Sequence, residues 1–211
     1  MKFNNIKQII LLITLSIAYA CCDRIDETEI NVITLNYTVA EKGEADGIIF
    51  YDKGEYSDGW RYIEVASEDI ISESEWGCYN TPIEDARNLE IGSGKTNTQV
   101  IIDFHDNLDT FYEDPTTCNE QSNGTVTAKI STDFRQNGLD DWFLPSKEEA
   151  SLMNTELHLK RLGNFDSEKL YWTSSEHDFS TAITTDFFNG DQGYLCKVCS
   201  QSTSIRVIRY F

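Results

Sequence analysis

Cys196 and Cys199 are separated by two residues near the end of the chain, a spacing that serves two kinds of chemistry. Two thiolates so placed can ligate a metal ion, or they can oxidise to a disulfide. A closed zinc site needs about four ligands, and the histidines that might complete one, His105, His158 and His177, are scattered along the sequence. We therefore interpret this pair as a local disulfide.

The run Gly92-Ser-Gly-Lys-Thr96 has the composition of a phosphate-binding loop. A P-loop also needs a glycine five residues before its second glycine, and that position is occupied by Leu89. No strand of the required kind precedes the run. We therefore exclude a nucleotide site and interpret this stretch as a loop that leads into a helix.

Three loops carry carboxylates or amides of the kind that bind calcium, which prefers roughly six to eight oxygen ligands. They are Asp140-Asp141, Glu176-His177-Asp178 and Asn189-Gly190-Asp191. We favour solvated turns for all three, so calcium remains only an alternative and no cofactor is expected. No Ser-His-Asp or Cys-His set can be selected from the scattered residues, so the sequence does not predict an enzyme.

The N-terminal residues have the order of a secretory signal that ends in a cysteine. Lys2 and Lys7 bracket a short positive start, an apolar run over residues 9–20 comes next, and Cys21 follows directly. The run is shorter than the roughly 20 residues that span a bilayer. We expect residues 1–20 to be a lipoprotein-type signal peptide and Cys21 to carry the lipid that anchors the chain to a membrane. Cleavage without lipid is the alternative, because Ala18-Tyr19-Ala20 also suits ordinary signal peptidase.

An exported chain with six cysteines is expected to hold them oxidised. Spacing alone does not fix the connectivity of the cysteines that remain once Cys21 is lipidated. We favour the pairs Cys78–Cys118 and Cys196–Cys199, with Cys22 outside this scheme.

The chain is strongly acidic, with 17 Lys and Arg against 36 Asp and Glu in 211 residues. This charge repels phosphate backbones, so nucleic acid is excluded as a partner, and it also disfavours sulfated polysaccharide. An aromatic content of 12% indicates a folded domain. We expect an acidic tether over residues 21–37 and a single domain over residues 38–211.

The predicted elements run from strands to helices and back to strands, which indicates an α+β fold. Strands are expected at residues 47–51, 60–65, 76–79, 171–175, 183–188 and 205–211, with turns at 52–54 and 189–193. Helices are expected from Thr98 to Phe104, capped by Asn97 or alternatively by Thr96, then over residues 125–134, and from Ser146 to Gly163. Ser146 and Glu149 form a capping box for the last of these.

A series of motifs in order resembles the Lcl C-terminal domain family, also called the major paralogous domain of some bacteria. The motifs are GIIFYDKG (47–54), GWRY (59–62), EWGC (75–78), IGSGKTNT (91–98), NGLDDWFLPSKEE (137–149), YWTSSE (171–176) and the closing RVIRYF. The resemblance runs from about Val39 to the last residue. It implies a C-type-lectin-like domain, similar also to the formylglycine-generating-enzyme fold, in which the two ends of the domain meet.

The resemblance also implies an exported or surface module, whose named member is an adhesin thought to bind sulfated polysaccharide. We expect a non-enzymatic binding module on the outer membrane or cell surface, with the periplasmic face as the other location. Its glycan or protein ligand would meet the loops at Glu176, Asn189, Asp191 and Tyr194. One alternative is a formylglycine-generating type of enzyme that uses copper at the C-terminal cysteine pair, and another is a structural envelope component.

Overall fold

The computed structural model describes residues 36–70, 73–201 and 203–211. The predicted signal peptide, Cys21, Cys22 and almost all of the predicted tether lie outside the described residues. The described part is a mixed domain of two sheets and three α-helices, supported by two disulfides, which confirms the expected α+β class. Within this part of the chain, no helix is long and apolar enough to cross a membrane.

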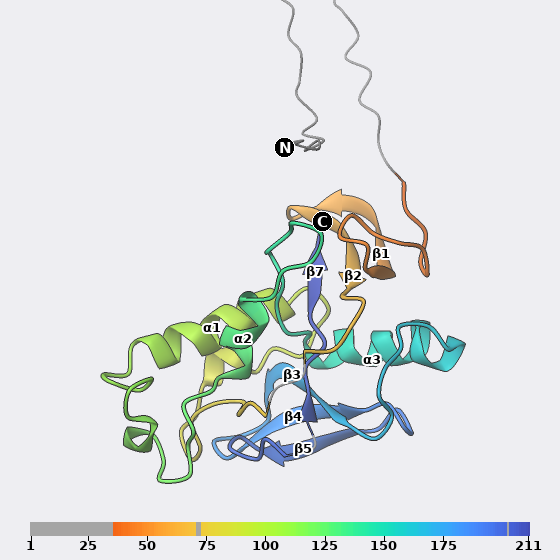
Figure 1. Ribbon diagram of the computed structural model, residues 1–211. Helices are drawn as coiled ribbons and strands as arrows, with labels where there is room; N and C mark the ends of the chain where they lie inside the picture. The colour runs from red at the N-terminus through yellow and green to blue at the C-terminus, as the bar shows by residue number, and fades with distance from the viewer. Residues whose placement is uncertain (1–35, 71–72, 202) are drawn as a thin grey trace, which may run out of the picture. The chain divides into compact units, whose positions relative to one another are not determined.

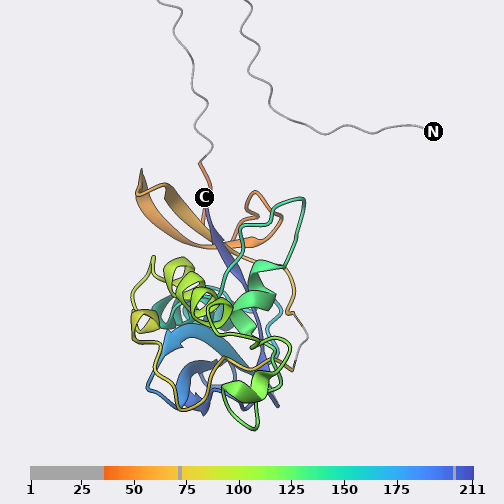
Figure 2. The same ribbon diagram turned by 90° about the vertical axis from the view of Figure 1, so that its left-hand side faces the viewer.

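The smaller sheet brings the two ends of the domain together. Its order is β1-β2-β7, all antiparallel, with β1 at Ile48–Ser57, β2 at Trp60–Val65 and β7 at Ile208–Tyr210. The ring of Tyr37 packs against Phe211 with their centroids 5.2 Å apart. The chain therefore enters and leaves the domain at the same place, as Figure 2 shows and as the sequence predicts.

The hairpin between β1 and β2 turns later than predicted. Asp52 lies within β1, where Arg61 of β2 donates to both of its carboxylate oxygens at 2.7 and 3.0 Å. The prediction of a turn at 52–54 is therefore wrong. The chain turns instead at Asp58 and Gly59, whose φ angles of 53° and 85° suit a tight two-residue hairpin.

The larger sheet has the order β5-β4-β3-β6. Its strands are β3 at Leu170–Glu176, β4 at Thr181–Asp186, β5 at Gln192–Cys196 and the short β6 at Thr203–Ser204, which alone pairs in parallel. The predicted turn at 189–193 is too long, because β5 already begins at Gln192. The strand predicted at 76–79 is absent, and a single bridge joins Glu75 to Val126 instead.

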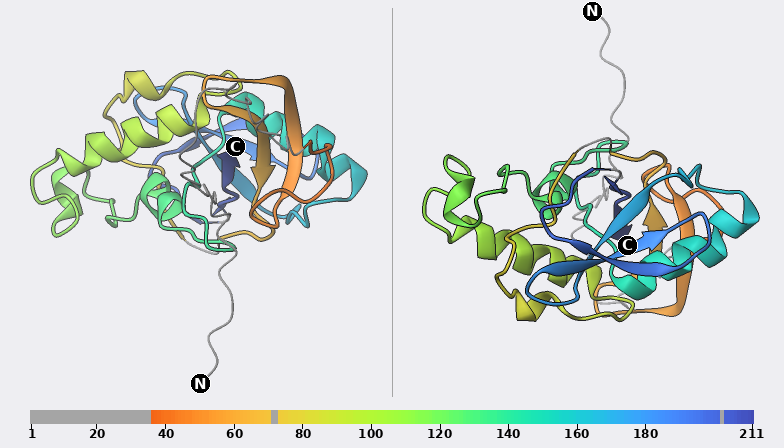
Figure 3. Two further views of the ribbon diagram at one scale, coloured as in Figure 1. Left: turned by 90° about the horizontal axis from the view of Figure 1, so that it is seen from above. Right: turned by 90° about the horizontal axis from the view of Figure 1, so that it is seen from below.

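Three helices lie over the same side of the larger sheet. They are α1 at Gly94–Asp106, α2 at Thr127–Thr132 and α3 at Lys147–Glu156, and Figures 1 and 3 show α1 and α2 towards one end of the sheet and α3 towards the other. The predicted capping box is confirmed, because Glu149 N donates to Ser146 Oγ and Ser146 N donates to the Glu149 carboxylate. The helix predicted to continue to Gly163 ends earlier, at Glu156. A separate short 3₁₀ turn at His158–Lys160 follows it.

The apolar interior has two clusters. One is built around Trp76, Trp142 and Trp172 beneath α1 and α2, and the other joins α3 to both sheets through residues such as Phe143 and Tyr171. Both predicted disulfides are formed, Cys78–Cys118 across 40 residues and Cys196–Cys199 across three.

Candidate functional site

Glu176, a predicted ligand contact, lies inside the domain at the end of β3 and is only 2% exposed. One of its carboxylate oxygens accepts hydrogen bonds from the amide of Ile83 at 2.7 Å and from the ammonium of Lys197. The other accepts from Arg87 Nε at 2.7 Å. Because both oxygens are engaged, Glu176 holds three segments of the fold together and does not face a ligand.

The other predicted contacts are on the surface of the β4–β5 hairpin. The side-chain amide of Asn189 donates to Asp191 at 2.8 Å within the exposed turn. Tyr194 is 62% exposed and stacks on His177, with ring centroids 3.6 Å apart. All three residues are exposed, unlike the buried Glu176, and their contact with a ligand stays a prediction.

The acidic loops do not fit a calcium ion, because their carboxylates are already engaged by protein groups. Arg209 donates to both oxygens of Asp141 at 2.7 and 3.1 Å. Asp178 accepts hydrogen bonds from Ser180 and Thr181, which hold its pKa well below the usual value. Among the described residues, no group of three or more His, Cys, Asp or Glu side chains could hold a metal ion.

The C-terminal cysteines likewise do not fit a copper site, because their sulfur atoms are bonded to each other.

His105 is buried in α1, with its Nδ1 2.7 Å from Ile101 O and its Nε2 accepting from Cys78 N at 3.0 Å. Burial lowers its pKa to about 4, so the ring is neutral. His105 therefore braces the backbone beside Cys78.

The glycine-rich run at the start of α1 is closed by protein groups. Burial and the Glu149 carboxylate raise the pKa of Tyr210, whose hydroxyl donates to Glu149 and meets the backbone amides of Gly94 and Lys95. Glu149 also accepts from Gly92 N at 2.8 Å. A phosphate here would have to displace Tyr210 and approach a buried carboxylate.

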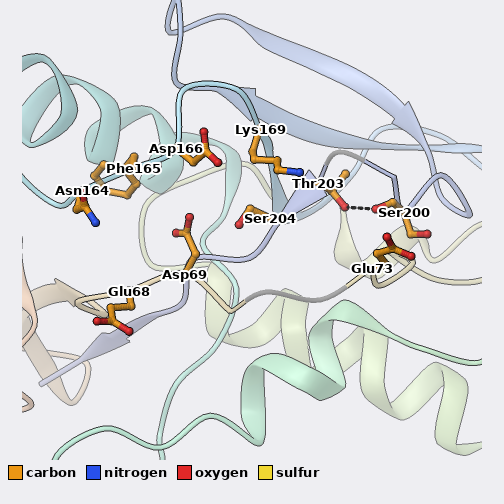
Figure 4. A pocket seen from close by; sticks show the side chains of 10 residues that line it. All are labelled: Glu68, Asp69, Glu73, Asn164, Phe165, Asp166, Lys169, Ser200, Thr203 and Ser204. Carbon is orange, nitrogen blue, oxygen red and sulfur yellow. Dashed lines mark hydrogen bonds between the residues drawn. The ribbon is translucent and has the colours of Figure 1, made fainter.

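A hollow of about 650 Å³, which the sequence did not predict, opens beside the start of β3. Three separate segments build it: the chain after β2, the loop before β3, and the chain around β6 (Figure 4). We call it the acidic hollow, and its lining residues are Glu68, Asp69, Glu73, Asn164, Phe165, Asp166, Lys169, Ser200, Thr203 and Ser204.

The acidic hollow has a fixed base. The carboxylate of Asp69 accepts from Arg206 Nε at 2.5 Å and from the Tyr171 hydroxyl at 2.6 Å. Arg206 is fully buried and also donates to backbone carbonyls, among them Gly163 O at 2.6 Å and Asn164 O at 3.2 Å. Burial and Asp69 together raise the pKa of Tyr171. This network ties two of the lining segments to the chain between β6 and β7.

The walls of the acidic hollow are polar and carry excess negative charge. Four carboxylates line it against one ammonium, that of Lys169, and the Asp69 carboxylate is already compensated by Arg206 behind it. Hydroxyl groups of Ser200, Thr203 and Ser204 add donors and acceptors. The arrangement suits a ligand rich in hydroxyl or amino groups and disfavours an anionic one.

One sequence signal does point to the acidic hollow. Arg206 lies between the apolar residues Ile205, Val207 and Ile208, a pattern that is typical of a buried segment. A buried arginine requires a hydrogen-bond acceptor, and in the structure that acceptor is the carboxylate of Asp69, which lines the hollow.

No protein-family model matches the chain, and no curated protein matches it in sequence. The resemblance to the Lcl C-terminal domain family therefore stays a prediction that depends on the motifs alone.

Proposed function

We propose that this protein is an exported lipoprotein of the cell envelope, anchored through a lipid on Cys21, and that residues 38–211 form a non-enzymatic binding module of the C-type-lectin-like kind. The observation that carries the proposal is the positive, apolar, small-residue and cysteine order of the N-terminal segment. The two disulfides of the domain support it, because such bonds persist in oxidising compartments outside the cytosol.

The ligand we propose is a neutral or amino-bearing glycan, bound in the acidic hollow. Carboxylates such as Glu68 and Asp166 accept hydrogen bonds from sugar hydroxyls, and Lys169 with the neighbouring serine and threonine side chains can donate to sugar oxygens. The excess of carboxylates disfavours sulfated glycans. The turn at Asn189 and Asp191 is the other candidate surface, and the experiment below separates the two.

The anchor is tested by replacing Cys21 with Ser and feeding the cells a labelled fatty acid. We expect the variant to lose the label and to leave the membrane fraction, because an acylated cysteine supplies the buried CH₂ groups that hold it there. Cys22→Ser is the matched control and should keep the label. If the label stays on Cys21→Ser and is lost from Cys22→Ser, the anchor is the second cysteine.

The ligand is tested by presenting the mature chain without its lipid to an array of neutral, amino-bearing and sulfated glycans. We then compare two charge reversals at exposed acids, Glu68→Lys in the acidic hollow and Asp191→Lys in the β4–β5 turn. Glu68→Lys should weaken binding at least about tenfold, which is roughly 1.4 kcal/mol, and Asp191→Lys should not. The reverse pattern would move the site to the turn, and preference for sulfated glycans would refute the charge argument.

A further inference from the structure

The two disulfides of the domain differ in how accessible they are. Cys78 is 2% exposed in the core and its bond to Cys118 closes a loop of 40 residues. Cys199 is exposed, and its bond to Cys196 spans only three residues at the end of the edge strand β5. A disulfide that closes a long loop constrains the unfolded chain more than a short one does, and exposed disulfides are the ones that reductants reach.

The two halves of the short disulfide are also held differently. Next to Cys196, Lys197 is fixed by backbone bonds, since its amide donates to Ser180 O at 3.0 Å and its carbonyl accepts from Trp76 N at 2.8 Å. The Lys197 side chain is buried as well, bonded to Glu176 and to Thr81 O. None of these contacts depends on the sulfur–sulfur bond. Breaking that bond would therefore leave Cys196 in place, while the Cys199 side would keep only the hydrogen bond from Cys199 N to Cys196 O at 2.9 Å.

We propose that Cys196–Cys199 is a reversible thiol–disulfide modification site whose co-reactant is a dithiol reductant, and that Cys78–Cys118 is a permanent structural bond. The thiolate of the reductant attacks Cys199 Sγ, forms a mixed disulfide and expels Cys196 as a thiolate, which takes a proton from water. The second thiol of the reductant then releases Cys199. The protein gains two electrons and two protons, and the reductant leaves as a disulfide.

Reduction at this site would act on the acidic hollow. Ser200, the residue after Cys199, lines the hollow, and its carbonyl accepts from Thr203 Oγ1 at 2.8 Å (Figure 4). With the disulfide open, the chain over residues 198–201 loses its covalent link to β5. The wall that Ser200 and Thr203 form would then loosen while the Arg206–Asp69 base stays in place. The modification site itself does not depend on the ligand proposed above.

The first experiment titrates the non-lipidated mature protein with dithiothreitol, caps free thiols with N-ethylmaleimide and locates the caps by peptide mass mapping. We expect Cys196 and Cys199 to be capped at concentrations at least about tenfold below those that open Cys78–Cys118, with the circular dichroism of the folded protein retained. Opening of both pairs over one range, or only together with unfolding, would overturn the proposal.

A second experiment identifies the attacked sulfur with single variants. Cys196→Ser leaves the Cys199 thiol and Cys199→Ser leaves the Cys196 thiol, while Cys78–Cys118 remains as an internal check of folding. An aromatic disulfide reagent should react with the Cys199 thiol at least about tenfold faster, because Cys199 is the exposed partner. Equal rates, or faster reaction of Cys196, would show that Cys199 is not the point of attack.

The link to the acidic hollow is tested by amide hydrogen exchange on the double variant Cys196→Ser/Cys199→Ser. Amides of residues 198–201 should exchange at least about tenfold faster than in the oxidised protein. The amides of Trp76 and Lys197 should keep their rates, because their hydrogen bonds do not need the disulfide. Unchanged exchange over 198–201 would refute the effect on the wall, and faster exchange at Trp76 would refute the anchoring of Cys196.

Discussion

Charged side chains are buried and paired at one end of β3 and exposed at the other. At the C-terminal end of the strand, Glu176 is fully enclosed and paired with Lys197 and Arg87. At its start, the acidic hollow leaves Glu68, Glu73 and Asp166 open to water with Lys169 as the lone lining cation. One strand thus connects a closed, neutralised cluster to an open, negatively charged one.

The difference shows that a carboxylate in a loop motif is not by itself a binding group. Glu176 stabilises the fold because its partners are already provided by the protein, and any ligand would have to replace them. The carboxylates of the acidic hollow still have unused acceptor capacity facing solvent. Exposure and free hydrogen-bonding capacity therefore favour the start of β3 as the functional end.

The strongest test of this comparison is a matched pair of lysine substitutions. Lys197→Met should destabilise the domain by about 3 kcal/mol or more, because it leaves Glu176 buried with only the partly exposed Arg87 as counter-charge. Lys169→Met, on the wall of the hollow, should change stability by less than about 0.5 kcal/mol. Urea unfolding of both variants measures the difference, and equal losses would show that the two ends of β3 are energetically alike.

A second test uses Glu75, which is buried near the closed end with no charged partner among the described residues. Its Oε1 accepts from Asn123 N at 2.9 Å, and burial raises its pKa from 4.5 to about 7. Since the folded state holds this proton more tightly than the unfolded state, Glu75 should lower stability as the pH rises from about 4.5 to 7, and the loss should persist above 7.

The variant Glu75→Gln keeps the Oε1 acceptor and removes the charge. It should therefore be more stable than the parent at pH 8, by on the order of 1–3 kcal/mol, with the gain vanishing near pH 4.5. Glu176→Gln is the control of opposite sign, because it strands the buried Lys197. His105 contributes the opposite pH dependence, because its lowered pKa makes the folded state more stable as the pH rises. His105 is present in both proteins, so subtracting the unfolding free energy of the parent from that of Glu75→Gln at each pH cancels its contribution. A pH-independent difference would contradict the assignment to Glu75.

The smallest expected effect is at the rim of the acidic hollow. Glu68→Gln removes one of several like charges, so it should raise stability slightly, by less than about 0.5 kcal/mol, at low salt. The gain should disappear at about 1 M salt, where the screening length falls to about 3 Å. Thermal unfolding at the two salt concentrations measures it, and a gain that survives high salt would mean that charge repulsion is not its cause.

Much of the fold follows from local patterns in the sequence. The capping box of Ser146 and Glu149, the strand over 60–65 and the Cys196–Cys199 pair are correct, because each depends on residues close in sequence. The favoured Cys78–Cys118 pair is also formed, although its two cysteines are 40 residues apart and spacing alone did not fix it. The turn predicted at 52–54 failed because cross-strand contacts from Arg61 keep those residues in β1. The Asp58-Gly59 dipeptide was the better turn signal.

The site could not be predicted in the same way. The acidic hollow is made from three segments that are distant in sequence, so only the tertiary fold brings Asp69, Asp166 and Ser200 together. Glu176 was singled out as part of an acidic loop, and nothing local shows that Lys197, 21 residues later, pairs with it. Burial of a charge depends on distant partners, which a linear pattern does not contain.

The contact between Tyr37 and Phe211 makes the domain suited to circular permutation. A short glycine linker could join the two ends, since their rings already touch. New termini could open in the exposed turn between β4 and β5, leaving both disulfides and the Arg206–Asp69 pair intact. The lipid that we propose on Cys21 could then be attached at these new termini, which would reverse the orientation of the domain relative to the proposed membrane.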